Sequence, residues 1–206
     1  MRKVSEKDEV PIWWFSQEEI KKRQNKLSSI QPSVSKHISK SFTNFTRIEK
    51  FDVVRDIDTL YGAVDKYYKK QVAPNSVCRP SCAYCCHVPV DLTLLEATRI
   101  FLYLGEEFPL ELTEIGPEDT STACPFLGTD AKCSIYRVRP FNCRLFASID
   151  SWYPCRDNEP HIIHCNGSSD TFIKIVDHLK EISSYIPDVK LPLTADIRQY
   201  FGHRKK

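Results

Sequence analysis

The sequence predicts a mainly α-helical protein with a small, irregular, cysteine-rich metal-binding centre and a short β-hairpin. Three observations support this fold class. Apolar residues recur at helical spacing in several stretches, and all nine cysteines lie between positions 78 and 165. A Gly-Thr-Asp turn separates two short extended pieces that contain Cys124 and Cys133. With 206 residues, the chain is long enough for one hydrophobic core with extensions.

Two helices are predicted before the first cysteine. Ser16, followed by two glutamates and then by basic residues 21–23, is typical of a helix start. Apolar residues with a helical period predict an amphipathic helix over residues 51–70. The turn-forming residues 73–76 end this helix and lead the chain to Cys78.

Three more helices are predicted after the first cysteines. One spans residues 91–104, where Thr93 and Glu96 match a capping box. The second begins after Ser168 or Ser169 and runs to about residue 185. The third is short and spans residues 194–201.

These patterns divide the chain into three segments. We predict a helical N-terminal extension over residues 1–77 and a cysteine-cluster metal-binding domain over residues 78–165. We expect the helices of residues 166–206 to pack on that domain.

Composition excludes several classes of partner and compartment. The net charge of +2 gives no reason to expect nucleic-acid binding, and no apolar run approaches the length of a membrane span. The N-terminal residues lack the apolar core of a signal peptide. The cysteine count is odd and Cys85 adjoins Cys86, which argues against a secreted disulfide scaffold. We therefore expect a cytoplasmic protein whose cysteines bind metal.

The first cysteine group places four thiols within nine residues, at positions 78, 82, 85 and 86. Gaps of this length let a tight turn direct two sulfurs at one ion. Thiolates suit zinc, iron–sulfur clusters and copper(I), so the identity of the metal stays open. Nearby histidines offer alternative ligands: His87 could replace one thiolate, and His161 and His164 could form a separate small site beside Cys165.

The spacing Cys78-x3-Cys82-x2-Cys85 also matches the signature of radical S-adenosylmethionine enzymes. That fold needs a β/α barrel around the motif. The flanking sequence has helical periodicity instead of alternating strands and helices, which argues against this alternative.

The second half of the cysteine-rich region contains further short motifs in a fixed order. They are Cys124-Pro125-Phe126-Leu127, Cys133-Ser134-Ile135-Tyr136 and Arg139-Pro140-x-x-Cys143-Arg144. Together with the first cysteine group, they resemble the zinc- or iron-chelating CxxCxxCC family, also called YkgJ-type, over roughly residues 75–158. The first gap of that name motif has two residues in the family and three here, after Cys78.

The resemblance implies eight metal ligands and leaves Cys165 outside the pattern. The ligands are Cys78, Cys82, Cys85, Cys86, Cys124, Cys133, Cys143 and Cys155. Eight thiolates could fill two zinc sites, one site plus redox-active thiols, or a four-iron cluster plus a structural group. The expected cofactor is therefore zinc or an iron–sulfur cluster. Arg137, Arg139 and Arg144 lie beside the third cysteine group and either offset its negative charge or form ordinary surface ion pairs.

We expect a cytoplasmic metal-binding protein whose cluster is mainly structural and whose helical surfaces meet a protein partner. The alternatives are an iron–sulfur-dependent enzyme, such as a protein lysine N-methylase, and a redox or metal-delivery protein. The sequence favours a non-enzymatic role, and no catalytic residue can be named. If the protein is an enzyme, methyl transfer or oxidoreduction fits these motifs best.

Overall fold

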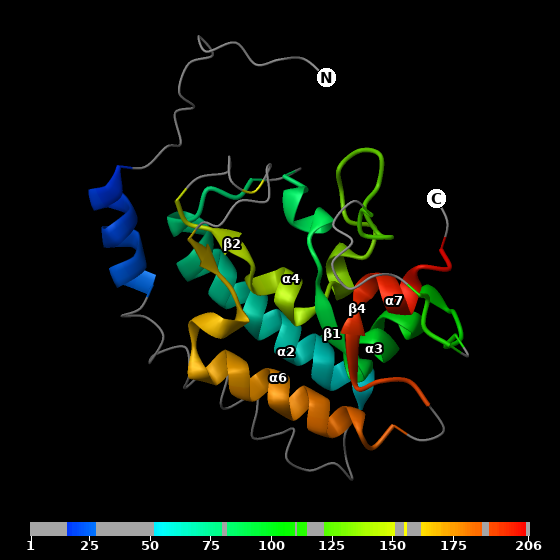
Figure 1. Cartoon of the computed structure of the whole chain (residues 1–206). Helices are drawn as coiled ribbons and strands as arrows, with labels where there is room; N and C mark the ends of the chain where they lie inside the picture. The colour runs from blue at the N-terminus through cyan, green and yellow to red at the C-terminus, as the bar shows by residue number, and fades with distance from the viewer. Residues whose placement is uncertain are drawn as a thin grey trace.

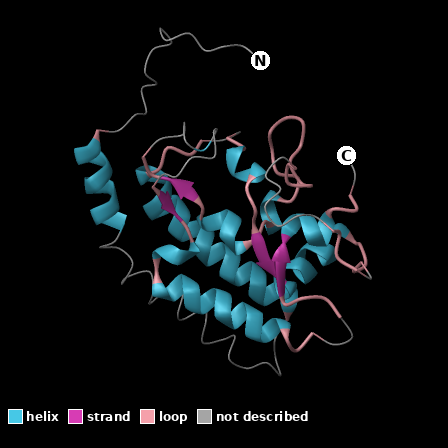
Figure 2. Ribbon diagram, in the orientation of Figure 1, coloured by secondary structure: helices cyan, strands magenta, loops and turns pink. Residues whose placement is uncertain are grey.

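The computed structural model describes residues 16–27, 52–79, 82–109, 111–114, 122–150, 155, 162–186 and 190–204. The described part is mainly helical and contains two small antiparallel sheets (Figure 2). The predicted fold class is therefore confirmed. The α-helices are residues 17–27, α2 (Val53–Tyr67), α3 (Leu94–Leu104), α4 (Phe141–Leu145), α6 (Asp170–Ser183) and α7 (Ile197–Phe201).

Short helical turns and strands connect these helices. A π-helical turn, η2 (Tyr68–Val72), extends α2, and the 3₁₀ turns are η3 (Ala73–Asn75), η4 (Tyr84–His87), η5 (Tyr136–Val138) and η6 (Asn166–Ser168). The strands are β1 (Asp91–Thr93), β2 (Ala147–Ser148), β3 (Ile163–His164) and β4 (Thr194–Asp196). Strand β1 pairs with β4 and β2 with β3, both antiparallel.

Side-chain caps begin α2, α3 and α6, and those of α3 and α6 were predicted. Asp52 accepts a hydrogen bond from the Arg55 amide at the start of α2, and Ser169 accepts one from the Thr171 amide at the start of α6. Thr93 forms a capping box at the start of α3. Helix α3 ends at Leu104 and is followed by Gly105, which has a φ of 68°, a conformation that glycine adopts without strain.

Two sequence predictions about helices are wrong. Residues 91–93 and 194–196 were expected in helices, but they form the paired strands β1 and β4. The pairing connects two segments far apart in the chain, and local periodicity contains no information about such a contact. Asp196 also holds the pair in place, because its carboxylate accepts hydrogen bonds from the Val90 and Arg198 amides.

The hydrophobic core consists of two clusters. The first lies between α2, α4 and α6 and includes Ile57, Leu60, Phe172 and Leu179. The second lies between α3, α7, the β1–β4 pair and residues 124–135, which we call the hairpin segment. Its buried residues include Ile100, Phe101, Phe126, Ile135 and Phe201. Figure 1 shows α2 running through the middle of the molecule, with α6 below it and the cysteine-bearing segments above.

A buried carboxylate connects the helices. Glu96 on α3 is only 3% exposed and accepts hydrogen bonds from the Tyr61 hydroxyl of α2 and from the Phe141 amide of α4. It also accepts hydrogen bonds from the Thr93 amide and hydroxyl. A buried charge is tolerated when its oxygens are fully hydrogen-bonded. Glu96 therefore acts as a cap, as predicted, and also fastens three helices together.

No helix among the described residues has the length and apolar character needed to cross a membrane. The described residues also contain no parallel strands, which a β/α barrel would require. The radical S-adenosylmethionine alternative therefore has no counterpart in the described fold.

Candidate metal centre

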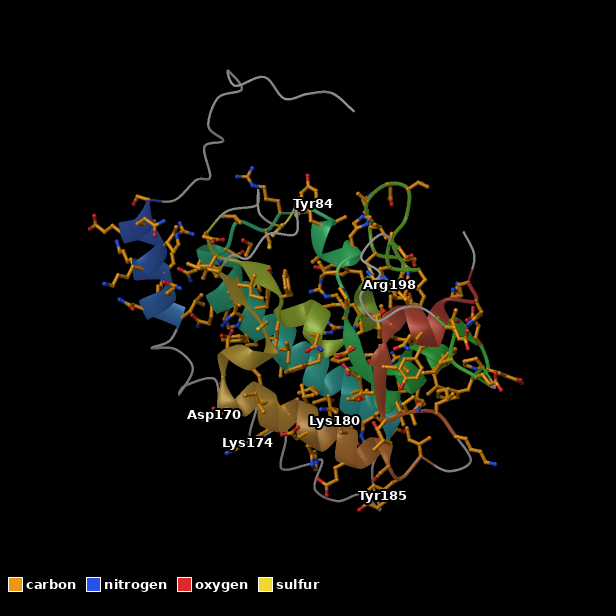
Figure 3. All side chains as sticks on the ribbon, viewed as in Figure 1. Tyr84, Asp170, Lys174, Lys180, Tyr185 and Arg198 are labelled. Atoms are coloured by element: carbon orange, nitrogen blue, oxygen red, sulfur yellow. The ribbon has the colours of Figure 1, made fainter. Side chains whose placement is uncertain are left out.

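The cysteines come from several chain segments on the side of the molecule opposite to α6. Figure 3 shows Tyr84 of η4 on this side, whereas Asp170 and Lys180 of α6 lie on the other. Cys78 follows η3, the pair Cys85 and Cys86 lies in η4, and Cys143 lies in α4. All nine cysteines are partly buried and none forms a disulfide bond.

Cys86, Cys124 and Cys133 are connected by backbone hydrogen bonds. The Cys124 amide donates to the Cys86 carbonyl at 2.7 Å. The Leu127 amide donates to the Cys124 carbonyl, and Leu127 forms an antiparallel bridge with Cys133. The predicted β-hairpin is thus reduced to a single bridge, and the Gly128 amide closes its turn by donating to the Lys132 carbonyl at 2.8 Å.

The thiols of this segment also interact electrostatically with Cys143. The pKa of Cys124 is raised to about 12. Burial is the main cause, and negative charge on Cys86 and Cys133 contributes to the same rise. Burial raises the pKa of Cys143 even more, and charge on Cys124, Cys133 and Cys86 adds to the effect. These four thiols therefore lie close enough to disfavour ionisation of one another.

A second set of thiols surrounds Ser148. The Ser148 amide donates to the Cys78 Sγ at 3.4 Å, and its side chain is hydrogen-bonded to Cys155. The Val77 amide donates to the Ser148 carbonyl at 2.9 Å, which brings the Cys78 segment against β2. Burial raises the pKa of Cys155 to about 11, and charge on Cys78 and Cys82 adds to this rise.

Cys85 lies between the two sets. Its thiol is hydrogen-bonded to Cys86, and this bond together with burial raises the Cys85 pKa strongly. Charge on Cys86, Cys143 and Cys78 raises it further.

Two arginines oppose this negative charge. Burial raises the pKa of Cys133, and the charges of Arg139 and Arg144 reduce this rise. Arg139 likewise reduces the rise in the pKa of Cys143. The Arg139 guanidinium lies 3.9 Å from the centre of the Tyr136 ring. Arg139 also forms an ion pair with Asp65, at 3.6 Å, so both arrangements that the sequence allowed are present for this arginine.

The other two arginines of that group have different environments. Arg144 is 1% exposed, and its side chain donates to Asp65 and to the carbonyls of Arg137 and Arg139. Its guanidinium also lies 3.9 Å from the Tyr61 ring centre. Arg144 therefore connects α4 to α2 as well as facing the thiols. Arg137 is exposed, as expected for a surface arginine.

Sequence reasoning missed one arginine beside the thiols, Arg198. It is 2% exposed and donates to the carbonyls of Thr122, Cys86 and Val88. Its guanidinium also forms an ion pair with Asp196. The positive charge of Arg198 reduces the rise in the Cys124 pKa that burial causes. The sequence offered no signal for this role, because Arg198 lies in the C-terminal helix, far along the chain from every cysteine.

The histidines near the cysteines are arranged differently from the ligands that the sequence allowed. His87 is exposed at the end of η4. His164 is 3% exposed, and its Nε2 lies 3.3 Å from the Tyr67 hydroxyl in the first core cluster. Burial lowers the pKa of His164 to about 4. His161 lies outside the described residues.

The donor set fits a thiophilic metal, although its side chains have not converged. Among the described residues, no three cysteine, histidine or acidic side chains lie close enough together to hold one ion. Raised pKa values keep thiols such as those of Cys124, Cys143 and Cys155 protonated at neutral pH. A metal ion would bind them as thiolates and release those protons. Buried sulfur ligands of this kind fit zinc or iron and do not fit magnesium or calcium.

Residues 77–167 match the CxxCxxCC family. The family model is described as a "putative zinc- or iron-chelating domain". The match confirms the resemblance identified from the short motifs, and its last residues include Cys165, which that resemblance left out. No curated protein and no solved structure matches the chain. The CxxCxxCC match supports metal chelation and does not distinguish zinc from iron.

Proposed function

We propose that this protein binds zinc or iron through the eight cysteines of the CxxCxxCC pattern, and that the bound metal is mainly structural. The observation that supports the proposal is the match of residues 77–167 to a zinc- or iron-chelating family, within which all nine partly buried cysteines lie. The segments that contain these cysteines have little regular secondary structure. Metal binding would therefore contribute directly to their folding free energy.

The alternatives differ in what the thiols would do. An iron–sulfur enzyme, such as a lysine N-methylase, needs an open iron position, and a delivery protein needs a site that releases its metal. Partial burial of all nine cysteines favours a closed, structural site. Clustered cysteines that bind metal also suit a reducing compartment, and we propose a cytoplasmic location. A protein partner at the helical surfaces stays a prediction.

Anaerobic purification followed by metal analysis, sulfide analysis and an absorption spectrum tests the proposal. We expect near-stoichiometric zinc in a colourless sample, or iron with acid-labile sulfide in a brown one. Removing the metal with a chelator should lower the midpoint of thermal unfolding by about 10 °C, because several kcal/mol of binding energy is lost. A metal-free protein with an unchanged midpoint would contradict a structural role.

Two single substitutions provide a matched comparison. Cys143→Ser removes a buried thiol of α4, and we expect it to lower metal content and thermal stability together. Cys165→Ser, outside the eight, should leave both nearly unchanged. Loss of metal in the Cys165 variant would add that residue to the ligands.

A further inference from the structure

We infer that the eight cysteines form two separate four-thiolate centres. This inference rests on the proposed function, because it divides the ligands of the same cluster. The hairpin centre consists of Cys86, Cys124, Cys133 and Cys143, and the Ser148 centre consists of Cys78, Cys82, Cys85 and Cys155.

The hairpin centre is assembled by direct backbone contacts. The hydrogen bond from the Cys124 amide to the Cys86 carbonyl joins η4 to the hairpin. The Leu127–Cys133 bridge then sets Cys133 opposite Leu127, three residues after Cys124. Both Cys124 and Cys133 pack against the second core cluster, which contains Phe126 and Phe201.

The fourth member, Cys143, is directed towards this group by its neighbours in α4. The Asn142 side chain donates to the Asp91 carbonyl at 2.7 Å, just after the η4 segment. The Arg144 side chain donates to the Arg139 carbonyl at 2.9 Å, close to the end of the hairpin segment. Cys143 lies between these two anchored residues, and Cys124, Cys133 and Cys86 are the thiols whose charge acts on it.

The Ser148 centre has its own anchors. Ser148 is hydrogen-bonded to the side chains of both Cys78 and Cys155. The Cys82 amide donates to the Arg79 carbonyl at 3.1 Å, which holds Cys82 close to the residue that follows Cys78. Cys78 packs against the first core cluster, whereas the hairpin cysteines pack against the second.

The four-coordinate geometry of a thiolate site assigns Cys85 to the Ser148 centre. The hairpin centre already has the four thiolates of a tetrahedral site, and the Ser148 centre has three without Cys85. The hydrogen bond between the Cys85 and Cys86 thiols makes the two centres neighbours. Adjacent residues of one 3₁₀ turn thus belong to different centres, an arrangement that sequence spacing left open.

Zinc loading followed by thiol labelling tests the division without any substitution. The reduced, metal-free full chain is titrated anaerobically with Zn²⁺ and labelled with N-ethylmaleimide. Intact molecules that hold one zinc are then fragmented in a mass spectrometer. We expect four unlabelled thiols in each such molecule, either those of the hairpin centre or those of the Ser148 centre. Unlabelled sets that mix the two centres would overturn the division.

Paired variants give a second measurement. Cys133→Ser should lose one of two zinc equivalents and retain protection at Cys78 and Cys155. Cys78→Ser should lose the other equivalent and retain protection at Cys124 and Cys143. Loss of both equivalents in either folded variant, or one polynuclear site protecting all eight thiols, would overturn the division but leave the proposed function standing. A wild-type chain that binds neither zinc nor iron would instead remove the proposed function.

Discussion

The His164 imidazole lies in the hydrophobic core, between α2 and α6. Its ring centre is 5.9 Å from the ring centres of both Tyr67 and Phe172. Burial in this apolar environment lowers the pKa of His164 to about 4, because the protonated ring loses its hydration. The folded protein therefore holds this histidine neutral at a pH at which the unfolded chain protonates it.

The stability of the protein should consequently depend on pH between about 6.5 and 4. The unfolded chain binds a proton near pH 6.5, whereas the folded chain binds it only near pH 4. The stabilisation is complete above pH 6.5 and is lost as the pH falls towards 4. The total loss is up to about 3 kcal/mol.

Urea unfolding of the wild type and of His164→Gln at several pH values measures this effect. We expect the wild type to lose more stability on acidification than the variant. Both proteins contain the same cysteines, so any acid-induced loss of metal cancels in the comparison. Equal pH dependence of the two proteins would show that His164 makes no contribution.

Residues such as His164 and Glu96 show where sequence reasoning ends at this scale. The capping role of Glu96 was predictable, because its partner Thr93 lies three residues away. Its bonds to Tyr61 and Phe141 were not predictable, since they depend on how helices pack. The same holds for the thiols: the sequence predicts eight cysteine ligands, but not which of them lie side by side.

At the scale of elements, β4 and α7 fix the hairpin segment from outside the CxxCxxCC region. Arg198 reaches three carbonyls there, including that of Cys86, which also accepts the Cys124 amide. Asp196 aligns the Arg198 guanidinium through an ion pair. A planar guanidinium can serve several acceptors at fixed angles, whereas an ammonium group cannot.

Arg198→Lys should therefore weaken metal binding by the hairpin cysteines without removing a charge. We expect about a tenfold loss of zinc affinity, as is usual when a group that orients metal ligands is replaced. In the metal-free protein, Cys86 and Cys124 should react several-fold faster with N-ethylmaleimide, because their segments are less firmly held. Competition with a chromophoric chelator and timed labelling measure the two effects.

Arg137→Lys is the matched control, since Arg137 is exposed in the described structure. It should leave both the affinity and the labelling rates unchanged. Equal behaviour of the Arg198 and Arg137 variants would mean that the carbonyl contacts of Arg198 do not position the cysteines.

The elements predicted best were those with strong local signals. Periodicity and caps located α2, α3 and α6, because each buries one apolar face and begins at a side-chain cap. The β1–β4 pair could not be foreseen, because its strands have three residues each and become strands only by pairing with one another.

At the scale of the whole molecule, helices from all three predicted segments meet in one body. Helix α2 packs on α3 and α4, and α3 packs on α6. The division of the chain at residues 77 and 165 stays a prediction. Two core clusters stabilise the helices, whereas the cysteine segments 82–90 and 122–135 contain only short turns and an isolated bridge.

Metal removal should therefore loosen the cysteine segments before it loosens the helices. After chelation, we expect amide hydrogen exchange over residues 82–90 and 122–135 to accelerate about tenfold or more. Amides in α2 and α6 should change much less, because the first core cluster does not depend on the metal. The control is protein treated with a chelator that has been saturated with zinc beforehand and therefore removes no metal. An equal acceleration in α2 would indicate that the whole fold requires the metal.

The pairing of β1 with β4 also constrains the order of events during synthesis. Translation proceeds from the N-terminus, so every cysteine leaves the ribosome before Thr194–Asp196 and Arg198 exist. Until then β1 has no partner strand, and the Cys86 and Thr122 carbonyls lack the hydrogen bonds that Arg198 of α7 donates. The nascent chain therefore displays its thiols in an unassembled state, and a mature hairpin centre can close only after the C-terminal helix has emerged.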